Sequence, residues 1–172
     1  MRPLINRDNT CCFSGYRPEK LPWGADESDP RCVGLKEALK DATEGIIRSG
    51  VRHFICGMAR GSDTYFCDAV LSLREEYAFA TLEAAIPYEA QARRWQDEER
   101  ERYSRLVGLC DYVTYISREY TRGCIFVRNR YMVDNASVLL AVYDGKPGGT
   151  GNTLKYAARR GLEIIELAPS ND

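Results

Sequence analysis

The sequence predicts an α/β protein with a Rossmann-like, doubly wound and mainly parallel sheet, flanked by helices on both faces. Six short apolar runs alternate with longer segments whose apolar residues recur with a period near 3.6. Several of the short runs are apolar on both faces, which is typical of strands in a buried parallel sheet. The length of 172 residues suits one domain with a sizeable core, so we expect a single domain over residues 1–172.

The expected strands and helices follow from these patterns in chain order. The strands are predicted at residues 10–14, 51–56, 80–86, 111–116, 136–143 and 163–167. Apolar stripes through Leu35 and Ile46, and through Phe66 and Leu73, predict helices after the first two strands. The charged segment 89–105 is predicted to be a helix with a solvated face and Trp95 turned inward. A fourth helix is predicted at 124–133, and a fifth begins after Thr150 or Asn152.

Composition and charge exclude several classes of protein. The 24 basic and 25 acidic residues leave a net charge of -1, which provides no electrostatic attraction for nucleic acid or anionic lipid. The first ten residues, MRPLINRDNT, lack the apolar core of a secretory signal. No stretch approaches the roughly 20 apolar residues of a membrane span. We therefore expect a cytoplasmic protein without a membrane partner.

The cysteines and the histidine do not form a metal-binding pattern. The seven cysteines are odd in number and contain no CxxC pair, so neither a disulfide framework nor a zinc site is expected. The single histidine, His53, falls within an expected strand, where a structural role is favoured. We expect no metal site and no required cofactor.

A glycine-rich stretch, YDGKPGGTGNT, follows the fifth expected strand at residues 143–153. In doubly wound sheets, ligands bind beyond the carboxyl ends of the strands. Gly148 and Gly149 allow close approach to a ligand, and Thr150 or Asn152 is expected to cap the next helix. The helix N-terminus is then expected to bind an anion such as phosphate. The stretch is neither a Walker A loop nor a GxGxxG fingerprint, and a surface turn without a ligand is the alternative.

Two further loops are predicted to open on the same crevice. CGMARGSD at 56–63 joins the second strand to a helix, with Gly57 and Gly61 at the turn and Asp63 as a ligand-binding residue or a helix cap. After the first strand, SGYRP places Gly15 and Arg17 at the strand end. An arginine there suits bidentate recognition of phosphate or carboxylate, and a structural salt bridge is the alternative.

Five segments together resemble one known superfamily. FSGYRPEKL, GMARGSD, IPYEAQARRW, RNRYMVD and YDGKPGGTGNTLKYA occur in order between residues 10 and 168. They are similar to the SLOG superfamily, and within it to the clade of small bacterial YspA/YpsA-like proteins of poorly known function. The wider superfamily includes the DprA/Smf DNA-processing proteins and LOG-type enzymes, which cleave nucleoside monophosphates. The resemblance implies a Rossmann-like fold and a nucleotide site.

The resemblance also bears on the segment RNRYMVDN, at residues 128–135. It implies that Arg128 and Asn129 face the crevice and hold a ribose or phosphate, whereas the alternative is a helix with its arginines in solvent. Asp144, in the glycine-rich stretch, is also predicted to bind the ligand. Tyr115 and Tyr120 either stack on a base or contribute to packing and partial exposure.

The LOG-type catalytic pattern is incomplete in this chain. LOG-type hydrolases are recognised by PGGxGTxxE, but here the sequence is PGGTGNTLK, with no glutamate between Thr150 and Gly161. Glycosidic cleavage requires a carboxylate. Among other acids, Asp63, Glu119, Asp134 or Asp144 could replace the glutamate only with a different geometry.

Three functional hypotheses follow. The first is a nucleotide-binding sensor or regulatory protein without turnover, whose ligand is similar to NAD, ADP-ribose or AMP. The second is an enzyme that hydrolyses the N-glycosidic bond of a nucleoside phosphate or an NAD-like compound. The third is DprA-like nucleic-acid binding, which the net charge disfavours. A regulatory protein partner and a homodimer are both compatible with the sequence.

Overall fold

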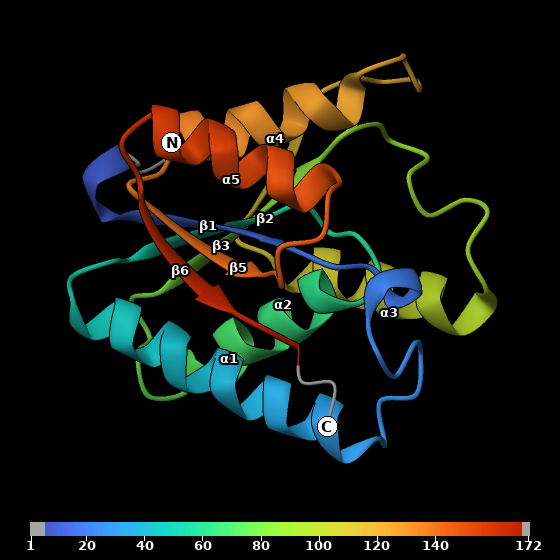
Figure 1. The fold of residues 1–172 in the computed structure, drawn as a ribbon. Helices are drawn as coiled ribbons and strands as arrows, with labels where there is room; N and C mark the ends of the chain where they lie inside the picture. The colour runs from blue at the N-terminus through green and yellow to red at the C-terminus, as the bar shows by residue number, and fades with distance from the viewer. Residues whose placement is uncertain (1–5, 170–172) are drawn as a thin grey trace.

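The computed structural model describes residues 6–169 and contains a six-stranded parallel sheet (Figure 1). The strand order is β4-β3-β2-β1-β5-β6. The strands are β1 (Thr10–Gly15), β2 (His53–Cys56), β3 (Thr81–Ile86), β4 (Tyr112–Tyr115), β5 (Val138–Val142) and β6 (Glu163–Leu167). The predicted α/β, doubly wound fold class is confirmed.

Within residues 6–169, five α-helices cover the two faces of the sheet (Figure 1). On one face lie α1 (Pro30–Arg48), α2 (Ser62–Leu73) and α3 (Asp97–Leu109). On the other face lie α4 (Cys124–Asp134) and α5 (Gly149–Arg159). Two short 3-10 helices, η1 (Arg7–Asn9) and η2 (Pro18–Lys20), flank β1.

Strand β5, which lies between β1 and the edge strand β6, is buried at all five positions, as its uninterrupted apolar sequence predicts. Because side chains alternate along a strand, Leu140 joins the core under α1 to α3, whereas Leu139 joins the core under α4 and α5. Phe13 of β1 stacks on Phe66 of α2 with ring centroids 4.5 Å apart. The sheet therefore separates two apolar cores.

The prediction of one helix over residues 89–105 is wrong at its start. Residues 89–94 form turns, and α3 begins at Asp97. The acidic residues Asp97, Glu98 and Glu99 occupy the first turn of α3, where the helix dipole favours negative charge. Trp95 precedes the helix and contacts the ring of Tyr103, with centroids 5.3 Å apart.

The predicted helix caps also differ from those observed. Gly148 is the N-cap of α5, so Thr150 and Asn152 lie inside the helix. Gly61 is the N-cap of α2, so Asp63 lies in its first turn. Since both N-cap residues are glycines, neither helix start is capped by a side-chain hydrogen bond. The glycine at each cap has a positive φ, which polar capping residues adopt far less readily.

The histidine and the cysteines are largely enclosed. His53 is buried, with Nδ1 2.7 Å from the Thr81 hydroxyl and Nε2 3.9 Å from a carboxylate oxygen of Glu83. All seven cysteines are free thiols, and Cys110 alone is not fully buried. Among residues 6–169, no helix is both long and apolar enough to cross a membrane.

Candidate functional site

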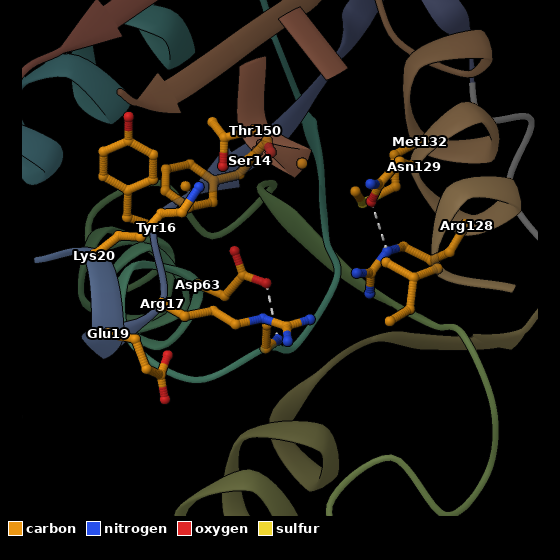
Figure 2. Close-up of a pocket in the computed structure, with 15 residues that line it drawn as sticks. Ser14, Tyr16, Arg17, Glu19, Lys20, Asp63, Arg128, Asn129, Met132 and Thr150 are labelled. Atoms are coloured by element: carbon orange, nitrogen blue, oxygen red, sulfur yellow. Dashed lines mark hydrogen bonds between the residues drawn. The ribbon is translucent and has the colours of Figure 1, made fainter. Parts of the chain in front are cut away.

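The order of the strands reverses its direction at β1, because β2 lies on one side of it and β5 on the other. Such a switch point leaves a crevice beyond the carboxyl ends of the strands. A cavity of about 360 Å³ lies there, between the loop after β1 and the first turns of α2 and α5, with α4 along one side (Figure 2). Seven of the predicted site residues line it: Gly15, Arg17, Asp63, Arg128, Asn129, Gly149 and Thr150.

Gly57 and Gly61 are not part of the lining of this cavity, and Gly61 lines a different one. A Cβ atom on Gly57 would lie 2.4 Å from Nη1 of Arg128. Gly61 has a φ of +78°, and a Cβ there would lie 2.9 Å from the carbonyl oxygen of Tyr16. Both positions exclude a side chain because other parts of the protein approach the backbone closely.

Gly149, in contrast, faces open space. A Cβ at this position would meet no atom within 4 Å. Gly148 precedes it with a φ of +150°, and α5 then begins without a side-chain cap. The backbone N–H groups of Gly149, Thr150 and Gly151 form no hydrogen bond within residues 6–169, and the first helical bond runs from Asn152 to Gly148. These N–H groups form the positive end of α5.

Arg17 and Arg128 differ in their freedom to bind a ligand. The side chain of Arg17 is exposed and makes no hydrogen bond or ion pair with the part of the chain that is described. Figure 2 shows its guanidinium beside Asp63, pointing into the cavity. Arg128 is only 4% exposed. Its Nη1 donates to the carbonyl oxygens of Gly57 at 2.6 Å and Ala85 at 3.3 Å, and its Nε donates to Asn129 at 2.9 Å.

Asp63 contributes a buried carboxyl group to the cavity. One carboxylate oxygen accepts a hydrogen bond from the backbone N–H of Ala59 at 2.8 Å (Figure 2). Burial raises the pKa of Asp63 to about 6, against the opposing effects of Arg128, the Ala59 N–H and Arg17. Both protonation states of this group are therefore accessible near neutral pH.

Tyr16 and Lys20 also line the cavity, although the sequence pattern did not single them out. The Tyr16 hydroxyl donates to a carboxylate oxygen of Asp144 at 2.6 Å, and the Lys20 ammonium donates to the carbonyl oxygen of Pro147 at 2.9 Å. The Tyr16 hydrogen bond, and then Lys146, hold the pKa of Asp144 below its usual value. Asp144 therefore connects the loop after β5 to the loop after β1. The available signal was the position of both residues in SGYRPEKL.

No group of three or more histidine, cysteine, aspartate or glutamate residues within the described range 6–169 is arranged to hold a metal ion. The charged groups at the cavity are instead Arg17, Lys20, Arg128, Glu19 and Asp63. This combination of cations and free N–H groups suits an anionic ligand.

The model of the YspA SLOG family matches residues 11–163 of this chain. The chain belongs to this family. A UPF0398 protein of Lysinibacillus sphaericus is 25% identical over 153 residues, which is 88% of this chain and 85% of that protein. The uncharacterized SPbeta prophage-derived protein YoqJ of Bacillus subtilis is 27% identical over 156 residues, covering 82% of this chain and 91% of the relative.

Two solved structures share the fold of this YspA SLOG protein. DNA processing protein A (DprA) from Streptococcus pneumoniae superposes on 91% of the chain with a TM-score of 0.61 and 12% identity. Protein TM1055 covers the same share with a TM-score of 0.55 and 14% identity. The chain spans about half of DprA, 49%, and 72% of TM1055. At these identities the likeness concerns the fold alone.

The two positions at which the LOG-type pattern would place its glutamate, Leu154 and Lys155, lie in α5. Leu154 is 6% exposed and packs in the core under α4 and α5, whereas Lys155 is exposed to solvent. Neither position supplies a carboxyl group to the cavity. The acids that line the cavity are Asp63 and Glu19.

Proposed function

We propose that this YspA SLOG protein binds a nucleotide or nucleotide derivative at the switch point of its sheet and acts as a sensor or regulatory protein without turnover. One observation carries the proposal. The N–H groups at the start of α5 and the guanidinium of Arg17, which have no partner within residues 6–169, face the same cavity. A phosphate would accept hydrogen bonds from the N–H groups and a charge-assisted pair from Arg17.

The size of the cavity and its other walls support a ligand larger than phosphate alone. About 360 Å³ lies within the usual range of small-molecule sites, roughly 300 to 1,000 Å³. Asn129 supplies an amide, and Ile125 and Met132 supply apolar surface beside the anion-binding end. Such a mixture suits a ribose and a base attached to the phosphate. The ligand classes to test are NAD, ADP-ribose, AMP and cyclic nucleotides.

The absence of turnover is inferred from the first turns of α5. A LOG-type reaction needs a carboxylate beside the phosphate-binding helix, and Leu154 and Lys155 replace it here. A protein with this site would report ligand concentration through a change in its own surface, read by a regulatory partner or by a second copy of the chain.

Replacing Gly149 by Val tests the phosphate site. The branched side chain would project into the open space beside the N–H groups, so binding of the best ligand in the panel should be abolished while the fold persists. Arg17→Ala should weaken binding about 10- to 150-fold, because it removes charge-assisted hydrogen bonds. Thermal-shift screening selects the ligand, and isothermal titration measures both variants.

Gly108→Val is the matched control, since Gly108 also has open space around its Cβ position and lies in α3, outside the cavity. It should bind as the unmodified protein does. Unchanged affinity in a folded Gly149→Val protein would contradict the proposed phosphate site and leave the glycines with a turn-forming role alone.

One observation favours the second candidate, hydrolysis of an N-glycosidic bond. The carboxyl group of Asp63 faces the cavity with its pKa raised by burial to about 6, which suits a general acid or base near neutral pH. Incubation of the protein with the same ligands, followed by chromatography for free base, distinguishes the two functions. Release of base that is lost in Asp63→Asn would favour the enzyme.

A further inference from the structure

A second cavity, of about 820 Å³, lies beyond the carboxyl ends of β3 and β4. Its walls are the loop after β3, at residues 88–95, and the loop after β4, at residues 118–120. It shares no lining residue with the cavity at the switch point. The first cavity follows β1, and the second follows β3 and β4, which lie two and three positions from β1 in the sheet. At the usual spacing of strands, these positions are about 10 to 14 Å from β1.

The second cavity carries concentrated positive charge. Arg93, Arg94 and Arg118 line it, and none of the three guanidinium groups has an ion pair or hydrogen bond to residues 6–169. Glu119 also lines it, and the neighbouring Glu89 donates its backbone N–H to the carbonyl oxygen of Arg118 at 3.3 Å. Three arginines and one glutamate therefore line the cavity, which leaves it positive on a chain whose net charge is -1.

Aromatic rings lie beside these arginines. Trp95 is half-buried and held edge-on by Tyr103, with ring planes 79° apart. Tyr88 and Tyr120 form a second edge-to-face pair with centroids 5.3 Å apart, and Tyr120 is 65% exposed. Large exposed aromatic surfaces next to free guanidinium groups are suited to stacking on a base whose phosphate is bound by arginine.

The loop that carries Trp95 is held in place by its own hydrogen bonds. Successive turns run from the N–H of Gln91 to Tyr88, of Arg93 to Ala90 and of Trp95 to Ala92, at 3.0 to 3.1 Å. The buried Gln91 side chain donates to the carbonyl oxygen of Gly57 at 3.3 Å. The arginines and rings are therefore presented by an ordered loop, which lowers the entropy cost of binding.

We propose that this cavity is a second nucleotide-binding site, which takes a mononucleoside phosphate. The Trp95 ring stacks on the base, and Arg93, Arg94 and Arg118 bind the phosphate. A longer polyanion is disfavoured because its further phosphates would meet Asp97, Glu98 and Glu99, which lie after Gln96 in the first turn of α3 and outside the cavity lining. The site is independent of the proposed function, since it requires neither Gly149 nor Arg17.

Intrinsic fluorescence provides a local test, because the chain has only two tryptophans, Trp23 and Trp95. Trp23 is buried away from this cavity, so Trp23→Phe leaves Trp95 as the sole reporter. AMP and ATP in metal-free buffer should quench Trp95 saturably. The added changes Arg94→Gln and Arg118→Gln should weaken the response at least about tenfold.

Two matched controls separate this site from the first. Adding Gly149→Val to the Trp23→Phe protein should leave the Trp95 response unchanged, and so should Arg159→Gln, at the far end of α5. Circular dichroism verifies that each variant is folded. If the Trp95 response is lost with Gly149→Val, the fluorescence reports binding at the first cavity. The proposal of a second site then fails, whereas the proposed nucleotide binding at the first cavity is retained.

Two other results would overturn the proposal. The absence of any saturable response of Trp95 to millimolar AMP or ATP would exclude nucleotide binding in this cavity. A short single-stranded oligonucleotide that binds far more tightly than either nucleotide, with a steep dependence on salt, would instead identify a nucleic-acid site.

Discussion

Two arginines that look equivalent in the sequence have different surroundings. Arg128 is almost fully buried and donates to two backbone carbonyl oxygens, so its guanidinium forms part of the wall of the cavity. Burial lowers the pKa of Arg128, with the nearby Asp63 acting in the opposite direction. Arg17 is exposed, and its charge is available to a ligand. Replacement of Arg17 should therefore lower the affinity for the ligand, whereas replacement of Arg128 should lower the stability of the fold.

At the residue scale, the raised pKa of Asp63 should make the stability of the protein depend on pH. Its folded-state pKa of about 6 lies above the unfolded value near 3.8, so the folded protein binds more protons between these values. The free energy of unfolding should fall as pH rises from about 4 to about 6, and stay level above that. Asp63→Asn removes the charge, so it should raise stability at about pH 8 by roughly 2 to 3 kcal/mol.

Urea unfolding at about pH 8 and about pH 4 measures this effect, and the difference between the two proteins should vanish at the lower pH. Asp41→Asn, at an exposed position of α1, is the control and should show no such change. A destabilised Asp63→Asn protein at about pH 8 would mean that attraction to the two arginines outweighs burial.

At the scale of elements, the turn after β2 and helix α4 meet at a residue without a side chain. Arg128 of α4 lies against Gly57, and the two are connected by a 2.6 Å hydrogen bond across 71 positions of the chain. A Cβ on Gly57 would lie 2.4 and 2.6 Å from two atoms of the guanidinium. The spacing between α4 and the sheet at this end of the crevice therefore depends on that glycine.

Gly57→Ala should lower the free energy of unfolding by about 1 to 3 kcal/mol, because Arg128 must leave its two carbonyl acceptors. Gly45→Ala is the control in α1, where a Cβ meets nothing within 4 Å and alanine favours the helix by roughly 0.5 to 1 kcal/mol. Both are measured by urea denaturation. Equal stability of Gly57→Ala and the unmodified protein would show that the guanidinium has room to move.

At the scale of the whole molecule, one sheet separates two cores, and the candidate ligand sites lie beyond the carboxyl ends of its strands. Leu139 and Leu140 are adjacent in β5 and fully buried in opposite cores. Since both cores share the strand β5, disruption of either should propagate through the sheet. Ligand-site variants should leave this arrangement intact.

Leu139→Ala and Leu140→Ala should each cost about 2 to 5 kcal/mol and retain one unfolding transition. Far-UV circular dichroism follows the helices of both layers, and fluorescence of the buried Trp23, measured in a Trp95→Phe background, follows the core under α1 to α3. The two midpoints should coincide in each variant. Separate midpoints in Leu139→Ala would contradict cooperative unfolding of the two layers, and Val127→Ala, at an exposed position, should shift neither.

The sequence by itself determined the fold class, because the periods of strands and helices are local and visible in single segments. The strand at 163–167 was predicted with its observed bounds, and the strand at 10–14 to within one residue. It also placed glycine-rich turns after the strands that flank the switch point. The family resemblance added that residues 128 and 129 face the crevice, and both line the cavity.

Only the tertiary structure decided which of these residues are free to bind a ligand. Gly57 and Gly149 both follow a strand. The Arg128 side chain fills the space beside the backbone of Gly57, whereas the backbone of Gly149 faces open space. The start of α3 and the cavity before it were also hidden, since the charged segment 89–105 contains no glycine or proline to mark where the helix begins. The physical reason is distance along the chain: whether a side chain is paired depends on partners many positions away, and a local pattern does not record them.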